Sequence, residues 1–201
     1  MKFFSKDLLY QKIESNYTPL VYIKSTGTQY IDALVEGRNN ITSIAEIEFE
    51  TAPTVETSVL SSGRGSASTR MNLIYSKGGY FTFGYGRNET YTNVSIQSGV
   101  KYKIESSYNY GYQEIMLDNT SIYTNTLSAN VSSNSSLYIF ARNSGSGPAN
   151  YASVKLYSLK LIQDGVTVRD FIPVLDGNNV PCLYDKIGEN YYSSLRFSCC
   201  T

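Results

Sequence analysis

Apolar and polar residues alternate with a period of two along most of this chain. Such alternation is typical of strands that bury one face and expose the other. It is clearest in two distant segments, residues 20–32 and residues 154–173. A turn sequence interrupts each segment, Thr26-Gly27 in the first and Asp164-Gly165 in the second, and we expect a hairpin at each. The two segments therefore predict the first and last strands of a single all-β domain.

Further stretches with the same period lie between these two segments. In residues 41–50, Ile47 and Phe49 share one face and three glutamates share the other. Predicted strands recur about every 8–12 residues, the spacing expected of a sandwich. The other predicted strands are 57–61, 71–75, 80–85, 91–96, 101–108, 114–117, 121–124 and 137–142, with a turn at Asp118-Asn119. The sequence therefore predicts an all-β fold, a two-sheet antiparallel jelly-roll sandwich.

The length of the chain favours one domain. Its 201 residues are 41% hydrophobic, and a second independent domain would leave both domains undersized. We expect an N-terminal arm at residues 1–18 and the sandwich domain at residues 19–201.

The arm carries apolar side chains at helical spacing after Ser5, a residue type that often begins a helix. A helix this short is marginal alone. We therefore expect the arm, helical or extended, either to pack on its own sandwich or to bind a neighbouring subunit. The predicted partner-binding residues of the arm are Phe3, Phe4, Leu8, Leu9 and Ile13.

The charge pattern gives no indication of a nucleic-acid or membrane partner. Seventeen basic residues balance 17 acidic ones, and the Lys and Arg residues form no stripe. The N-terminal residues lack the uninterrupted apolar run of a signal peptide, and no later stretch reaches transmembrane length. We expect the protein to fold in the compartment where it is made.

Cysteine and histidine usage limits the chemistry further. Cys182 lies in an apolar run and is predicted to be a small buried hydrophobe, whereas the adjacent Cys199 and Cys200 would bridge each other only with strain. We expect reduced thiols. The chain has no histidine, which excludes Ser-His-Asp and Cys-His hydrolases, histidine-ligated metals and histidine acid/base catalysis.

Three glutamates alternate along one predicted strand, at positions 46, 48 and 50. In retaining glycosidases two carboxyl groups lie about 5 Å apart on one face, so Glu46 and Glu50 are candidates for such a pair. Any strand with one face in water shows the same alternation. We favour this second interpretation and predict no catalytic residue.

Specific motifs lie near the C-terminus: Lys-Leu-Tyr-Ser at 155–158, Val-Arg-Asp-Phe-Ile-Pro at 168–173 and Leu-Tyr-Asp at 183–185. With Ser-Thr-Gly-Thr-Gln-Tyr-Ile-Asp at 25–32, the chain resembles the laminin-G-like branch of the concanavalin A-like lectin/glucanase superfamily. The form that it resembles is met in phage virion proteins and gut-bacterial surface proteins. The resemblance covers roughly residues 20–192.

This resemblance implies a non-enzymatic phage virion structural protein, a capsid decoration or tail appendage whose lectin-like sandwich adheres to glycans or a host surface. It implies a homo-oligomer that contacts other virion proteins through its arm and that is made in the host cytoplasm. A soluble bacterial carbohydrate-binding module is the alternative, and a retaining glycosidase is a third.

The ligand site is predicted from polar and tyrosine side chains in or beside flexible loops. Laminin-G-like domains can also hold calcium with aspartates, but the five candidate aspartates here lie in turns, where turn chemistry explains them, and we predict no metal or cofactor. These aspartates are Asp118, Asp164, Asp170, Asp176 and Asp185. The predicted ligand-binding residues are Arg64, Arg87, Tyr108, Tyr110, Arg142 and Asn143.

Overall fold

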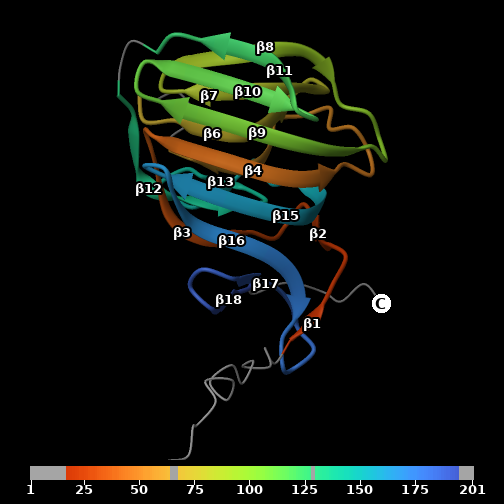
Figure 1. The fold of residues 1–201 in the computed structure, drawn as a ribbon. Helices are drawn as coiled ribbons and strands as arrows, with labels where there is room; N and C mark the ends of the chain where they lie inside the picture. Colours follow the sequence, from red (N-terminus) through yellow and green to blue (C-terminus); the bar gives the residue numbers. More distant parts are fainter. Residues whose placement is uncertain (1–16, 64–67, 128–129, 195–201) are drawn as a thin grey trace, which may run out of the picture.

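A computed structural model describes residues 17–63, 68–127 and 130–194. Within these ranges the chain forms strands and no helix, and the strands make two sheets packed face to face (Figure 1). Pairing is antiparallel apart from one two-residue contact between strands β13 and β5. The predicted all-β, two-sheet sandwich is confirmed. The predicted arm residues, Phe3 to Ile13, lie outside the described residues, as do Cys199 and Cys200.

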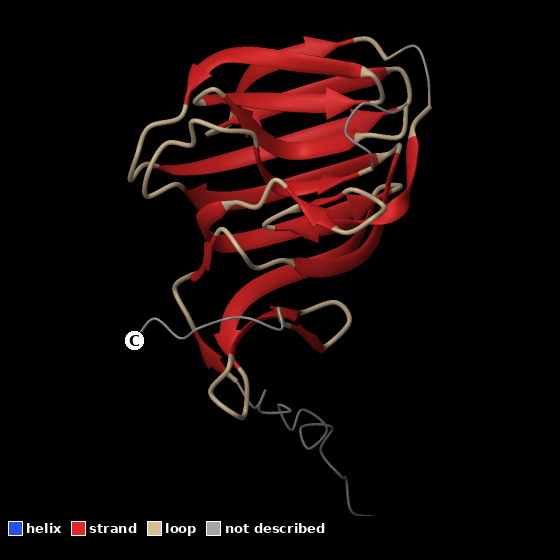
Figure 2. Cartoon of the chain, turned by 180° about the vertical axis from the view of Figure 1, so that it is seen from behind, coloured by secondary structure: helices blue, strands red, loops and turns tan. Residues whose placement is uncertain are grey.

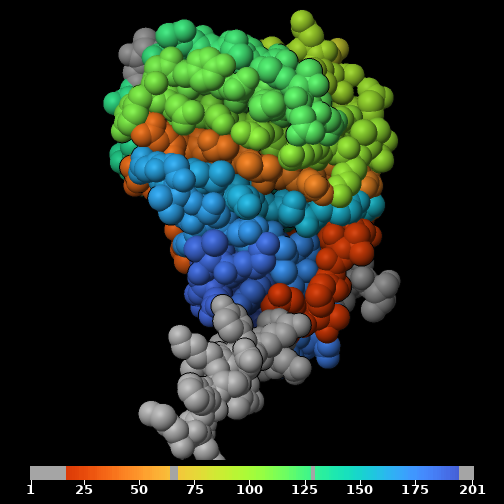
Figure 3. Space-filling model, viewed as in Figure 1, coloured from red at the N-terminus to blue at the C-terminus, as the bar shows by residue number. Residues whose placement is uncertain are grey.

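The larger sheet has the strand order β11-β10-β9-β4-β15-β16-β17-β18, with β2 paired to β15 and β1 to β16. It lies at the front in Figure 1, and Figure 3 shows its lower end, where the first and last described strands lie together. Its strands are β1 Thr18–Pro19, β2 Ile23–Thr26, β4 Ile41–Glu48, β9 Lys101–Asn109, β10 Tyr112–Leu117, β11 Thr120–Asn125, β15 Ser153–Gln163, β16 Val166–Leu175, β17 Pro181–Asp185 and β18 Asn190–Tyr192.

The smaller sheet lies behind the larger one and faces the viewer in Figure 2. Strand β12 joins β3 to β5, and the sheet continues from β5 through β6 and β7 to β8. Its strands are β3 Ile31–Arg38, β5 Thr57–Ser62, β6 Met71–Lys77, β7 Tyr80–Tyr85, β8 Asn88–Ser95, β12 Ser132–Ile139, β13 Arg142–Asn143 and β14 Pro148–Ala149.

The core fills the space between the two sheets. In the larger sheet Ile47 and Phe49 are buried while the glutamates beside them point outward, as the alternation predicted. The Tyr85 ring from the smaller sheet stacks on Tyr108 from the larger sheet, with ring centroids 5.5 Å apart. Aromatic contacts of this kind tie the sheets together beyond the area that they bury.

One of the two predicted hairpins is present and the other is wrong. Asp164 and Gly165 have φ of 52° and 78° and join β15 to β16 in a tight turn. The segment after Thr26-Gly27 instead crosses from the larger sheet to the smaller one, because β2 pairs with β15 and β3 pairs with β12. The buried Gln29 side chain fixes this crossing, since its Oε1 accepts the Thr26 N–H at 2.8 Å.

Cys182 is a core residue, as predicted, with 1% of its surface exposed. Burial raises the pKa of its thiol to about 11, so almost no thiolate is present near neutral pH. We expect iodoacetamide to leave Cys182 unmodified in the folded protein and to alkylate it in urea, as mass spectrometry of the tryptic peptides would reveal. Full alkylation without denaturant would contradict this burial.

Candidate functional site

A single row of side chains crosses the outer face of the smaller sheet, the face turned away from the core. Residues directly opposite each other on paired strands point to the same face. Phe83 and Tyr85 of β7 point into the core, so Gly84 between them faces outward. Following the register from Gly84 across six strands of the sheet, β3, β12, β5, β6, β7 and β8, gives what we call the outer row: Asp32, Tyr138, Ser61, Asn72, Gly84 and Glu89. Five strand spacings make it about 24 Å long.

Charged residues surround the β8 end of the outer row. Glu89 forms ion pairs with Arg70 at 3.3 Å and with Lys77 at 3.6 Å, and Lys77 also pairs with Glu56 at 3.1 Å. Hydrogen bonds to Tyr91 and Glu56 raise the pKa of Lys77, so its ammonium stays charged. These four charged side chains therefore neutralise one another and hold that end of the face in place.

Gly84 is required by the close approach of two polar side chains. A Cβ atom at this position would lie 2.9 Å from Asn72 Nδ2 and 3.0 Å from Arg70 Nε. Real Cβ atoms almost never lie closer than 3.0 Å to another heavy atom, so the first distance is too short and the second is at that limit. The glycine thus lets the Asn72 amide and the Arg70 guanidinium lie flat against the sheet.

Several buried polar atoms on this face have no hydrogen-bond partner among the residues that the structure describes. They include Asn72 Nδ2, Ser58 Oγ and Arg142 Nε. Asn72 and Ser58 are 0% exposed, and Arg142 is half-buried on β13 opposite Ser61. Buried polar atoms without partners are rare, and each calls for an explanation such as a bound water or ligand.

The β3 end of the outer row opens into a hollow of ≈ 450 Å³. Tyr30 lies in its wall and stacks on Tyr138, with ring centroids 4.5 Å apart and planes at 28°. Burial, with the nearby charge of Asp32, raises the pKa of Tyr138, so its hydroxyl remains a donor. The residues that line the hollow are Thr28, Tyr30, Asp32, Pro148, Tyr151, Ser193 and Ser194.

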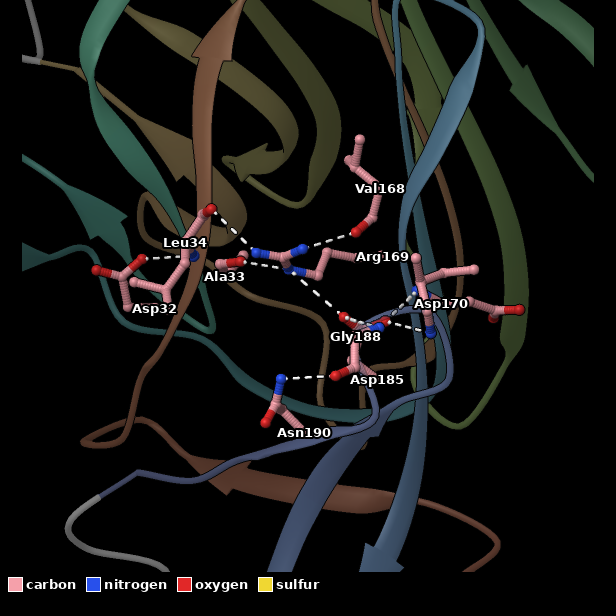
Figure 4. Close-up of polar contacts among 10 residues, drawn as sticks. Asp32, Ala33, Leu34, Val168, Arg169, Asp170, Asp185, Gly188 and Asn190 are labelled. Carbon is pink, nitrogen blue, oxygen red and sulfur yellow. Dashed lines mark hydrogen bonds and ion pairs between the residues drawn. The ribbon is translucent and has the colours of Figure 1, made fainter. Parts of the chain in front are cut away.

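Arg169 of β16 supports the hollow from inside the sandwich (Figure 4). Its guanidinium donates from Nε to the Ala33 carbonyl at 3.0 Å and from Nη2 to the Leu34 carbonyl at 3.2 Å. Leu34 has a φ of 52°, rare for a residue with a branched side chain, and its N–H donates to Asp32 Oδ1 at 2.8 Å. Arg169 therefore fixes the bulge that presents Asp32 at the hollow.

Asp185 anchors Arg169 in turn. This carboxylate is 0% exposed and lies 3.7 Å from Arg169 Nε. It accepts the backbone N–H groups of Asp170 at 2.9 Å, Ile187 at 3.1 Å and Gly188 at 3.2 Å (Figure 4). A Cβ atom at position 188 would lie 3.0 Å from Asp185 Oδ2, so glycine suits this contact. The motifs Val-Arg-Asp-Phe-Ile-Pro and Leu-Tyr-Asp thus meet in one structural network.

This network also accounts for one of the candidate calcium ligands. The Asp185 oxygens face N–H donors and a guanidinium, which is the environment of a satisfied carboxylate and the opposite of a cation site. Among the described residues, His, Cys, Asp and Glu form no cluster of three that could hold a metal ion.

The three glutamates of β4 lie on the outer face of the larger sheet, away from the outer row. Lys101 lies 2.5 Å from Glu46, Lys155 lies 2.8 Å from Glu48 and Lys24 lies 2.6 Å from Glu50. The hydrogen bond from Lys155 lowers the pKa of Glu48, and that from Lys24 lowers the pKa of Glu50. A glycosidase acid needs a raised pKa. The contacts are those of an ion-paired strand face.

The lowered pKa of Glu48 predicts a small loss of stability in acid. Because its pKa in the folded state lies below the ordinary 4.5, its contribution is present above that pH and is lost as the pH falls through the folded value. We expect the melting temperature to fall less between about pH 5 and pH 3 in Glu48→Gln than in wild type. Thermal unfolding at low salt measures this. Glu105→Gln, at a residue without an ion pair to the described part of the chain, is the control.

The predicted ligand-binding residues fall into three groups. Arg142 lies on the same face as the outer row, and Arg87 is exposed in the β7–β8 turn. Tyr110 is 61% exposed at the β9–β10 turn, outside the outer row. Arg64 lies outside the described residues.

Two predicted ligand-binding residues have structural contacts instead. Tyr108 is 0% exposed, stacks on Tyr85 and donates its hydroxyl to the Asn72 carbonyl at 2.9 Å, so its side chain belongs to the core. Asn143 is 8% exposed and donates to the Ser136 carbonyl at 3.0 Å while its Oδ1 accepts the Gly145 N–H. It fixes a loop.

The sequence alone did not predict that most residues of the outer row are neighbours. Asn72, Glu89 and Tyr138 lie on strands far apart in the chain, and nothing in their local sequence marks them as neighbours. Only Gly84 gave a local indication, as the small residue on the outward face of a strand with aromatic residues inward.

Comparisons with known proteins bear on the fold. No protein-family model matches the sequence, and comparison with curated proteins finds no match. Among solved structures, a candidate carbohydrate-binding protein from Bacteroides ovatus matches with a TM-score of 0.66 and 11% identity over 89% of this chain. This chain spans 59% of that protein.

Two further structures match less closely. Trypanosoma rangeli sialidase in complex with sialic acid has a TM-score of 0.52 and 14% identity over 73% of this chain, but only 26% of the sialidase is covered. Domains LG4-5 of the mouse laminin α1 chain match with a TM-score of 0.49 and 10% identity, over 74% of this chain and 44% of the laminin chain. Together with the two-sheet topology, the matches to the Bacteroides and sialidase structures show that the chain has the concanavalin A-like jelly-roll sandwich fold.

Proposed function

We propose that this protein is a non-enzymatic glycan-binding module that uses the outer face of its smaller sheet. The observation that carries the proposal is the tyrosine-lined hollow of ≈ 450 Å³ at the β3 end of the outer row, where Asp32 and Tyr138 are partly exposed, whereas Ser61, Asn72 and Gly84 in the middle of the row are buried. Sugar rings offer apolar faces that stack on tyrosine and hydroxyls that both donate and accept hydrogen bonds. Tyr30, Tyr151 and Asp32 supply these contacts together in one concave site.

A glycan array followed by titration calorimetry tests the proposal. We expect Tyr30→Ala and Tyr151→Ala each to weaken binding of the best array ligand by about tenfold, equal to about 1.4 kcal/mol. Tyr22→Ala is the matched control, because Tyr22 is a half-exposed tyrosine that packs on Tyr157 outside the outer row. Equal loss in Tyr22→Ala, or no glycan bound on the array, would count against the proposal. Sugar release that disappears in Glu46→Gln would instead favour a glycosidase.

We propose a phage particle as the setting, on the strength of the motifs at 155–158, 168–173 and 183–185. In that setting the protein is a homo-oligomer whose arm, residues 1–18, contacts its neighbours. Deleting the arm should then dissociate the oligomer in light scattering and leave glycan affinity unchanged. A full-length protein that is monomeric at all concentrations would favour the soluble bacterial carbohydrate-binding module.

A further inference from the structure

We infer that the glycan carries a carboxylate, which binds Asn72 in the middle of the outer row together with Arg142 of β13 beside it. The inference rests on the proposed glycan-binding function and specifies the class of glycan. It starts from Arg142, a half-buried guanidinium that forms no ion pair with any described residue. Its Nε is buried and has no hydrogen-bond partner within residues 17–63, 68–127 and 130–194.

Two other cations of this face, Arg70 and Lys77, do form ion pairs. Arg70 pairs with Glu89, and Lys77 pairs with both Glu56 and Glu89. Asp32, the carboxylate at the β3 end of the outer row, makes no ion pair with Arg142. A partly buried charge without a counter-ion is costly, and an anionic ligand removes that cost.

Asn72 supplies a second donor beside Arg142. The Ser61 hydroxyl donates to Asn72 Oδ1 at 2.5 Å, which orients the amide and leaves Nδ2 as the group without a partner. Arg142 on β13 and Asn72 on β6 are both in register with Ser61 of β5, which also pairs with Tyr138 of β12. Their backbones are therefore about 10 Å apart, within the length of one or two sugar rings.

The Arg142 guanidinium and the Asn72 amide are both hydrogen-bond donors, so they favour a ligand group that accepts. A guanidinium and a primary amide both present N–H donors in a plane, and a planar carboxylate accepts from both. Ser58, fully buried with its hydroxyl unpaired among the described residues, lies three positions before Ser61 on β5, and the register shifts on both sides of Leu60 place the two serines on the same face. A neutral sugar offers no charge to match Arg142.

Since Asn72 is fully buried, a ligand reaches its amide only when the side chains above it move. A direct test of the contact is therefore to measure the NMR signals of the N–H groups themselves. We would record the Arg142 Nε–H and Asn72 Nδ2–H₂ signals by nitrogen-edited NMR during titration at constant ionic strength. The probes are sodium D-glucuronate, methyl β-D-glucoside as the neutral match, and glucose 6-sulfate as a second anion.

We expect glucuronate to shift both signals in a saturable way, and the neutral glucoside to shift neither. Arg142→Gln should weaken glucuronate binding at least tenfold, whereas the control Arg38→Gln, at an exposed arginine that pairs with Asp164, should change it less than twofold. Equal responses to glucuronate and glucose 6-sulfate would overturn the carboxylate assignment.

Two other results separate this inference from the proposed function. If neutral and acidic sugars bind equally and Arg142→Gln has no effect, the inference fails while glycan binding stands. If no sugar on the array and no probe binds, both the proposed function and the inference that rests on it are wrong.

Discussion

Replacing Asp185 with alanine is expected to lower the free energy of unfolding by about 3–5 kcal/mol, the usual cost of removing one partner of a buried ion pair. The carboxylate is 0% exposed, and its loss leaves the Arg169 guanidinium without its charge partner. It also leaves the backbone N–H groups of Asp170, Ile187 and Gly188 without an acceptor. Urea unfolding followed by circular dichroism measures the change.

An exposed ion pair provides the control for Asp185. Glu46 pairs with Lys101 at 2.5 Å, but 40% of its side chain is exposed, so Glu46→Ala should cost at most about 1 kcal/mol. Arg169→Ala combined with Asp185→Ala should cost less than the sum of the two single changes, because the groups share one network. A stability of Asp185→Ala within about 1 kcal/mol of wild type would contradict the structural role of this network.

Replacing Tyr108 with alanine should be the second large loss, about 3–5 kcal/mol. Its ring is fully buried between the sheets and stacks on Tyr85, so the truncation leaves a cavity that the rigid strands cannot fill. Tyr108→Phe keeps the ring and removes the donor to the Asn72 carbonyl, which should cost about 1–3 kcal/mol. Denaturant unfolding distinguishes the two substitutions.

The neighbouring Tyr110 serves as the matched control for Tyr108. It is 61% exposed, so Tyr110→Ala should stay within about 0.5 kcal/mol of wild type. If Tyr108→Ala kept wild-type stability but lost glycan binding, the sequence prediction that Tyr108 contacts ligand would be restored and its assignment to the core would be wrong.

The alternation of side chains predicted the elements where one face is apolar throughout. Strand β4 was expected at residues 41–50 and ends at Glu48, and β15 and β16 meet at the predicted Asp164-Gly165 turn. Strand β4 buries every second residue, and the first part of β15 does the same; such rows depend only on neighbouring positions in the sequence.

The elements that the alternation did not predict depend on contacts between residues far apart in the sequence. Strand β3 runs to Arg38, beyond the predicted residues 20–32, and its register with β12 shifts between Asp32 and Glu36. The contact with Arg169 that stabilises this bulge comes from distant sequence. Strand β12 begins at Ser132 in a run of serines and asparagine with no apolar pattern. Its pairing with β3 and β5 holds it in the sheet.

The candidate site depends even more on distant pairing. The motif around Arg169 and Asp185 marks the fold, and its contribution to the site is indirect, through the bulge at Leu34. The outer row itself comes from six strands, and only their register shows that its members are neighbours.

The location of glycan contacts on the two sheets tests the central claim most directly. With tyrosine rings labelled with carbon-13, NMR titration with the best ligand from the array should shift the ring signals of Tyr30, Tyr138 and Tyr151 at the hollow. The signals of Tyr22 and Tyr157, which pack on each other outside the outer row, should stay in place. Shifts confined to Tyr22 and Tyr157 would contradict recognition by the outer face of the smaller sheet.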